Sequence, residues 1–239
     1  MNIQPLISVL KERYYDETDT RKLVILLGQL GDFDSLEYAM EVVKQIEKLE
    51  AADISLLFIG IGNEVGKACF CKFTGLSPKY LLVIPTPTLH NQLGLYSGLN
   101  LPVGPWTNML LMCAGVGSPN TIQEVFRGYT GDRNASPRLQ EDESIKIGFL
   151  PEIQGRTFSK FLGTGFLRPF ELASLRLRNM IEVLSNWECY MPSDRYLTQR
   201  GATFFLDKEY RVIYYFRQKS ILGYSKDMRT PLAFFDSLL

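Results

Sequence analysis

The sequence predicts an α/β fold, with a central mixed sheet flanked by helices and a long, mainly helical insertion before a C-terminal β-hairpin. Two observations support this prediction. Between residues 5 and 96, continuous apolar runs alternate with amphipathic helical patterns, which is typical of parallel strands covered by helices on both faces. Near the end, the apolar segments 202–206 and 211–217 flank the polar residues 207–210, a pattern that predicts a hairpin.

The N-terminal part contains three predicted strands and the helices that connect them. Asp34 and Glu37 have the spacing of a capping box, which marks the start of the helix after the first strand. A short amphipathic helix is expected before that strand, around residues 5–13. The expected strands are the apolar runs 23–27, 54–61 and 80–85, with helices over 34–51 and 62–73 between them.

The regular alternation stops at Ser97 for about a hundred residues, which is too long for a plain loop. We therefore expect a single domain over residues 1–239, with a structured insertion over 97–168. Helices are predicted at 106–113, at 118–129 with Ser118 as the cap, at 169–187, and at 231–236. The helix at 169–187 has an apolar stripe that consists of Phe170, Ala173, Leu177, Ile181 and Leu184.

The charges of the chain cancel, with 26 basic and 26 acidic residues. A net charge of zero favours no nucleic-acid partner, since such proteins carry a basic surface. The charge is nevertheless uneven: residues 1–60 hold 6 basic and 11 acidic groups, and residues 145–200 hold 8 basic and 5 acidic groups. We expect this acidic head and this basic segment to pair within the molecule.

The four cysteines and the single histidine limit the chemistry that the chain can do. No Cys-x-x-Cys is present and His90 is the one histidine, so neither a metal site nor a cofactor is expected. The cysteine number and the absence of a secretory pattern at the start favour a reduced, cytoplasmic location without disulfides. Cys69 and Cys71 point to different sides of their helix, and we expect Cys69 in the core and Cys71 nearer the surface.

The segment from Tyr80 to Gln123 has no charged side chain. It is interpreted as a buried or self-packed insertion. The alternative is an uncharged docking face for another protein, which includes a second copy of this chain, with peripheral membrane contact as a weaker variant. The residues of that face are Trp106, Met109, Leu110, Leu111 and Met112.

Several segments, in their order and spacing, resemble one known family. They are residues 23–39, 56–63, 73–76, 93–96 and 201–215. The chain is identified by them as similar to the peroxiredoxin-like branch of the AhpC/TSA superfamily, in a cyanobacterial-type variant. The resemblance implies a thioredoxin-like fold. It also implies that redox relatives carry Cys-x-x-Cys at the turn after the first strand, where helix amides stabilise a thiolate.

The positions of this sequence that match those two cysteines are Asp32 and Ser35. Neither side chain can form a disulfide or be oxidised as a thiolate is, so the family's antioxidant activity does not transfer to this turn. Asp32 is interpreted as a helix cap, and a retained ligand pocket is the alternative. Arg200 enters the strand that abuts this turn in the fold, and we expect it to pair with Asp32 or Asp34.

Two function hypotheses follow from these residues. In the first, the chain is a binding, scaffold or regulatory module without catalysis. In the second, it is a divergent thiol-dependent oxidoreductase that uses Cys71 or Cys113. A role for His90 in acid/base catalysis is ranked below a surface or helix-cap role, because no nucleophile or acidic partner can be assigned to it.

Overall fold

The computed structural model describes residues 2–13, 19–148 and 150–236. Its centre is a five-stranded mixed sheet, which confirms the predicted fold class. β1 runs parallel to β2 and β2 runs parallel to β3, while β6 is antiparallel to both β1 and β7. In spatial order the strands are β3 (Leu81–Ile84), β2 (Ile54–Ile61), β1 (Arg21–Gln29), β6 (Ala202–Leu206) and β7 (Val212–Arg217).

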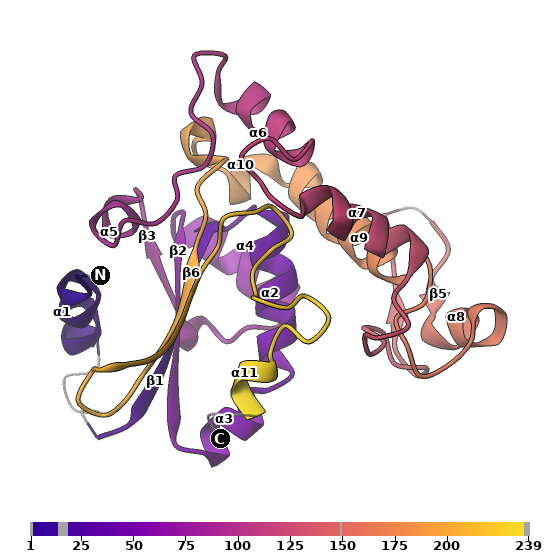
Figure 1. The fold of residues 1–239 in the computed structure, drawn as a ribbon, viewed down its shortest axis with the longest axis horizontal. Helices are drawn as coiled ribbons and strands as arrows, with labels where there is room; N and C mark the ends of the chain where they lie inside the picture. The colour runs from indigo at the N-terminus through magenta and orange to yellow at the C-terminus, as the bar shows by residue number, and fades with distance from the viewer. Residues whose placement is uncertain (1, 14–18, 149, 237–239) are drawn as a thin grey trace.

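Helices cover both faces of the sheet (Figure 1). On one face, α1 (Gln4–Arg13) and α5 (Thr88–Gln92) pack Leu6, Leu10 and Leu89 against the strands. On the other face lie α2 (Phe33–Val43), α4 (Glu64–Thr74) and the short α3 (Ile46–Ala51) and α11 (Ala233–Asp236). The two covered faces explain why β1 and β2 are apolar along almost their whole length, as predicted.

The segment between β3 and β6 forms helices that extend away from the sheet, with α7 and α9 side by side (Figure 1). A small separate core of Leu139, Ile145, Ile147 and Phe158 lies at its far end. The elements are α6 (Pro105–Cys113), α7 (Thr121–Thr130), β4 (Ser144–Ile145), β5 (Ile153–Gln154), α8 (Gly155–Leu162), α9 (Glu171–Ser185) and α10 (Trp187–Tyr190). Two short 3-10 helices are also present: η1 (Pro78–Tyr80) precedes β3, and η2 (Asp194–Tyr196) precedes β6.

Three local predictions are corrected by the structure. The helix expected over 34–51 is two helices, because α2 ends at Val43 and α3 begins at Ile46. Asn120, and not Ser118, is the N-cap of α7; the Ser118 hydroxyl instead accepts the Ile221 amide at 2.8 Å. The apolar stripe predicted for α9 is largely exposed at Phe170, Leu177 and Leu184. The reason is that α9 packs against α7 and α2 with only part of its surface.

Among the helices that the structure describes, no span has the length and apolar character needed to cross a membrane.

Candidate functional site

The turn between β1 and α2 lies at the carboxyl end of the central parallel strand, the edge at which α/β sheets place their sites. The strand ends in an irregular register, and the Leu30 amide donates to the Ile61 carbonyl at 3.1 Å. Gly28 is needed here, since an added Cβ would come within 2.6 Å of the Gln199 carbonyl oxygen. That close approach brings the segment before β6 directly against the turn.

Asp32 is the N-cap of α2, so its interpretation as a helix cap is confirmed, whereas the capping box predicted at Asp34 and Glu37 is wrong because Asp34 lies inside the first turn. The backbone of Asp32 is extended, with φ −69° and ψ 125°, and its carboxylate accepts the Asp34 amide at 3.4 Å. Caps of this kind stabilise a helix by about 1 kcal/mol. The interpretation of Asp32 as a structural cap is therefore sufficient to explain its presence.

Arg200 pairs with both carboxylates of the turn, as expected. Its Nη1 lies 3.0 Å from Oδ2 of Asp32 and 3.3 Å from Oδ2 of Asp34. The remaining guanidinium donors bind the carbonyls of Thr198 and Leu197, both at 3.1 Å. The arginine is fully buried, and it fixes the chain before β6 to the start of α2.

The three charges do not balance, and this shifts the titration of the carboxyls. Burial raises the pKa of Asp34 well above its usual value, and repulsion from Asp32 adds to the rise, while Arg200 opposes it. Burial also raises the pKa of Asp32, against the attraction of Arg200. Oδ2 of Asp34 accepts the Leu222 amide at 2.6 Å, whereas Oδ1 has no hydrogen-bond partner among the described residues. With one of the two carboxyls protonated, the cluster of Asp32, Asp34 and Arg200 carries no net charge.

The site-equivalent positions expose no reactive group. Asp32 and Ser35 are each 3 % exposed, and Asp34 is still less accessible. A buried ion pair is not a nucleophile, and the Ser35 hydroxyl is closed off from solvent. The junction of β1 and α2 therefore holds a buried, structural ion cluster.

The cysteines differ from the sequence predictions in two ways. Cys69 is bonded to Cys189, which is 120 residues away, so the expectation of a chain without disulfides is wrong for this pair. The reason is that α10 packs on α4, a contact that spacing in the sequence does not reveal. Cys71, which we expected nearer the surface, is buried, and burial raises its pKa.

Cys113 is the exposed free cysteine of the described chain. It lies at the end of α6, close enough to the turn for Asp34 and Asp32 to affect its titration. Burial of the sulfur and the nearby carboxylates raise its pKa above the ordinary 9.0. Both free thiols are thus held in the protonated, weakly nucleophilic form.

An apolar cavity of about 390 Å³ opens beside the turn, between α6, α7 and α9. Phe33 of the turn and Cys113 both line it. Exposed side chains on its walls include Val125, Tyr129 and Phe170. The one charged wall residue, Arg176, is already paired with Glu37 and Glu124.

The structure separates the residues of the expected docking face. Leu110 is 66 % exposed, and Trp106 is half exposed and packs against Trp187 with a centroid distance of 4.9 Å. Met109 and Leu111 are partly buried. Met112 and Arg200 are fully buried and are not part of any surface, because Met112 fills the core between α6 and Leu222 and Arg200 holds the ion cluster.

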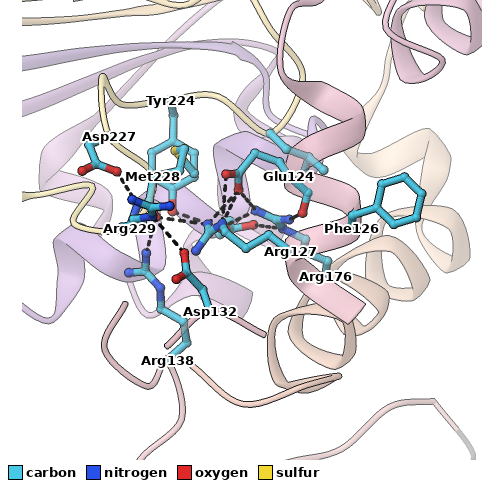
Figure 2. Close-up of polar contacts among 12 residues, drawn as sticks. Glu124, Phe126, Arg127, Asp132, Arg138, Arg176, Tyr224, Asp227, Met228 and Arg229 are labelled. Atoms are coloured by element: carbon cyan, nitrogen blue, oxygen red, sulfur yellow. Dashed lines mark hydrogen bonds and ion pairs between the residues drawn. The ribbon is translucent and has the colours of Figure 1, made fainter. Parts of the chain in front are cut away.

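A second ionic network joins the acidic N-terminal part to the helical segment. Glu37 accepts hydrogen bonds from Arg176 at 2.7 Å and from the Tyr224 hydroxyl at 3.0 Å. Burial alone would raise the pKa of Glu37, but these hydrogen bonds and the charges of Arg176 and Arg138 outweigh it and lower the pKa. Figure 2 shows Arg127, Arg138 and Arg176 converging on this region from different elements. The pairs of Arg176 with Glu37 and of Arg200 with Asp32 and Asp34 confirm the predicted attraction between the acidic head and the basic segment.

His90 is fully buried, so the surface or cap role that we expected is wrong. Its Nε2 lies 2.7 Å from the Leu27 carbonyl oxygen, and burial lowers its pKa, which keeps the ring neutral. Among the described residues, no group of three or more His, Cys, Asp or Glu side chains has the arrangement of a metal site.

A comparison with protein families gives one match. Residues 41–220, about three quarters of the chain, match the model of the family described as AhpC/TSA antioxidant enzyme. The matched region begins after the turn that carries Asp32 and Ser35. No curated protein matches the chain, and no solved structure does.

Proposed function

Because this chain belongs to the AhpC/TSA family, we propose that it is a peroxiredoxin-like protein that has lost the thiol site and works as a non-catalytic binding or scaffold module. The observation that supports this most strongly is the buried cluster of Asp32, Asp34 and Arg200 at the turn. Peroxide reduction needs a thiolate that attacks an oxygen atom of the peroxide. A capped and ion-paired turn supplies no such group.

The binding surface that we assign to the module is the apolar cavity together with the exposed side chains around it. Its occupant is the apolar side chains of a protein partner. Exposed aromatic residues support this choice: Phe126, Tyr129 and Phe170 lie on α7 and before α9, and aromatic side chains are the usual anchors of protein interfaces. The cavity adjoins Phe33, so a partner would dock at the edge where redox relatives present their thiols.

A second candidate function is a divergent thiol oxidoreductase that uses Cys113. Its position favours this hypothesis, since it lies on the cavity wall next to the turn. The raised pKa of the thiol opposes it. Cys71 is a weaker candidate, because it is buried as well as protonated.

Turnover of hydrogen peroxide and of an organic hydroperoxide, with a dithiol reductant, separates the two functions. We expect the wild-type rate to equal that of Cys113→Ser, of Cys71→Ser and of the variant in which all four cysteines are replaced. A wild-type turnover that one of these single substitutions abolishes would contradict the non-catalytic proposal.

The binding half of the proposal is tested by cross-linking in the native cell. We expect a stoichiometric partner that is lost in the double variant Phe126→Ser, Tyr129→Ser. Phe161→Ser is a matched control, because Phe161 is 80 % exposed on α8 and does not line the cavity. Equal capture by the double variant and the wild type would rule out this surface.

A further inference from the structure

A second cavity, of about 790 Å³, lies between α7 and the segment that follows β7. Five cationic and two acidic side chains line it. Its walls also include the aromatic residues Tyr214, Phe216 and Phe234. Cavities of this size are typical of small-molecule sites, and the excess of positive charge distinguishes this one from the apolar cavity near the turn.

The two carboxylates of the cavity differ in their partners. Glu124 binds Arg127 at 2.7 Å and Arg176 at 3.3 Å, so its charge is compensated. Asp227 accepts the backbone amide of Arg229 at 2.9 Å and keeps its negative charge. The cationic side chains of the cavity still outnumber this one carboxylate.

Four of the cationic groups keep unused donors, and Arg217 is one of them, since its buried Nε has no hydrogen-bond partner among the described residues. Arg127 is only 9 % exposed, and its Nη1 has no hydrogen-bond partner among the described residues, although its other donors bind Glu124 and the Met228 carbonyl. A buried guanidinium nitrogen without an acceptor is costly. Lys219 and Lys226 are exposed at the cavity, and neither pairs with a carboxylate in the part of the chain that the structure describes.

Arg229 and Arg217 each have one partner outside the cavity wall. Arg229 binds Asp132 at 3.1 Å, and Arg217 reaches the Leu93 carbonyl at 3.4 Å. Figure 2 shows Arg229 beside Asp132, and it shows Phe126 of α7 pointing away from the ionic residues. The residues of α7 that line the cavity are thus the polar ones, Asn120, Gln123, Glu124 and Arg127.

The N-terminus of α7 supplies a further feature that favours anions. Its cap, Asn120, has φ 67° and makes no side-chain hydrogen bond to the first turn. Pro119, Asn120 and Gln123 line the cavity, so the positive end of the helix lies at its wall.

We propose that this cavity binds the phosphate or pyrophosphate group of a small organic ligand. Lys219 and Lys226 contact the anion at the open side, and Arg127 supplies the buried donor. The aromatic wall accommodates the organic part of the ligand. The site is a separate cavity that adjoins the binding surface proposed above, because Leu222 lines both cavities.

Calorimetric titration of the full chain with inorganic pyrophosphate at low ionic strength tests the site. We expect saturable binding at one site, weakened at least about tenfold by the double substitution Lys219→Met, Lys226→Met, because each lysine donates a charge-assisted hydrogen bond. Both lysines are exposed, so this variant should keep the wild-type circular dichroism spectrum and melting temperature.

The matched control is Lys72→Met, Lys160→Met, which removes the same charge from exposed positions outside the cavity. It should bind pyrophosphate as the wild type does. Absence of saturable binding to the wild type, or equal weakening in both double variants, would overturn the proposal. The second result would mean that pyrophosphate responds only to the overall charge of the protein.

Discussion

At the scale of single residues, Arg200 makes the turn after β1 a structural ion cluster. It is fully buried, and it bridges two carboxylates that would otherwise be uncompensated. A thiolate at this turn would be stabilised by the same helix amides that Asp32 now occupies. In this chain the charged groups at the turn form ion pairs that join the start of α2 to the segment before β6.

Replacing Arg200 by methionine should destabilise the protein by about 3–5 kcal/mol, because it leaves buried carboxylates without a counter-charge. Urea unfolding measures this loss. The control is Arg211→Met, whose ion pairs lie on the exposed hairpin turn and should contribute less than about 1 kcal/mol. Similar small effects for both variants would show that the buried cluster is not structural.

Asp34 should make stability depend on pH in the direction set by its raised pKa. Its folded pKa lies above the ordinary 3.8, so the folded state holds the proton over a range where the unfolded state has released it. Its contribution therefore favours the fold below about pH 3.8 and is lost as pH rises through the raised value.

Asp34→Asn removes this titration while keeping an oxygen that can accept the Leu222 amide. The free energy of unfolding of the variant, minus that of the wild type, should become more positive as pH increases above about 4. Unfolding curves at a series of pH values measure the difference. A difference that stays constant, or that falls with pH, would mean that Asp34 is not held protonated by its surroundings.

At the scale of elements, the disulfide between Cys69 and Cys189 holds α10 on α4. It closes a loop of 120 residues that contains the whole helical segment after β3. The sequence suggested no such bond, because the cysteines are far apart and the reduced-cysteine interpretation fitted their low number. The spacing of cysteines in a sequence does not show that α4 and α10 pack together, and the disulfide depends on that contact.

The double variant Cys69→Ser, Cys189→Ser should lose about 2–4 kcal/mol of stability, as expected for removal of a cross-link across a long loop. The wild type treated with a dithiol reductant should show the same decrease. Mass spectrometry of the alkylated, non-reduced protein checks the bond itself. Alkylation at both positions before reduction would show that the bond does not form.

The secondary structure could largely be predicted because its signals are local. Continuous apolar runs specify β1, β2 and β3, and the capping-box spacing at Asp34 and Glu37 predicts the start of α2 two residues after the observed N-cap, Asp32. Met112 could not be placed from local signals, because a methionine fits an exposed docking face as well as a core. Its burial depends on tertiary packing against Leu222, which the sequence does not show. The pairing of Arg200 was predictable, since the fold brings its strand to the turn.

At the scale of the whole molecule, the helical segment is attached to the sheet domain by charge as well as by apolar contact. Arg176 links Glu37 of α2 with Glu124 of α7, and Arg138 binds Glu41 at 2.8 Å. These pairs are partly or fully shielded from water, so each depends strongly on its partner. The uneven distribution of charge along the sequence reflects these ion pairs, since Glu37 lies in the acidic part and Arg176 in the basic part.

Arg176→Met should therefore loosen the segment more than it loosens the sheet. We expect faster amide hydrogen exchange in α7 and α9, with little change in β1 and β2, because the lost contacts join α9 to α2 and α7. Mass-spectrometric hydrogen exchange measures this difference. Arg195→Met on the exposed surface is the control, and an exchange pattern equal to that control would contradict the role of the network.

The central claim is that the chain keeps the fold of a thiol enzyme without an activated thiol. The most direct test is the pH dependence of alkylation of Cys71 and Cys113 in the folded wild type, read residue by residue by mass spectrometry. We predict that both react with midpoints above the ordinary pKa of 9.0, since burial and nearby carboxylates disfavour their thiolates. A midpoint below about 7 at either cysteine, the range of activated thiols, would contradict the account.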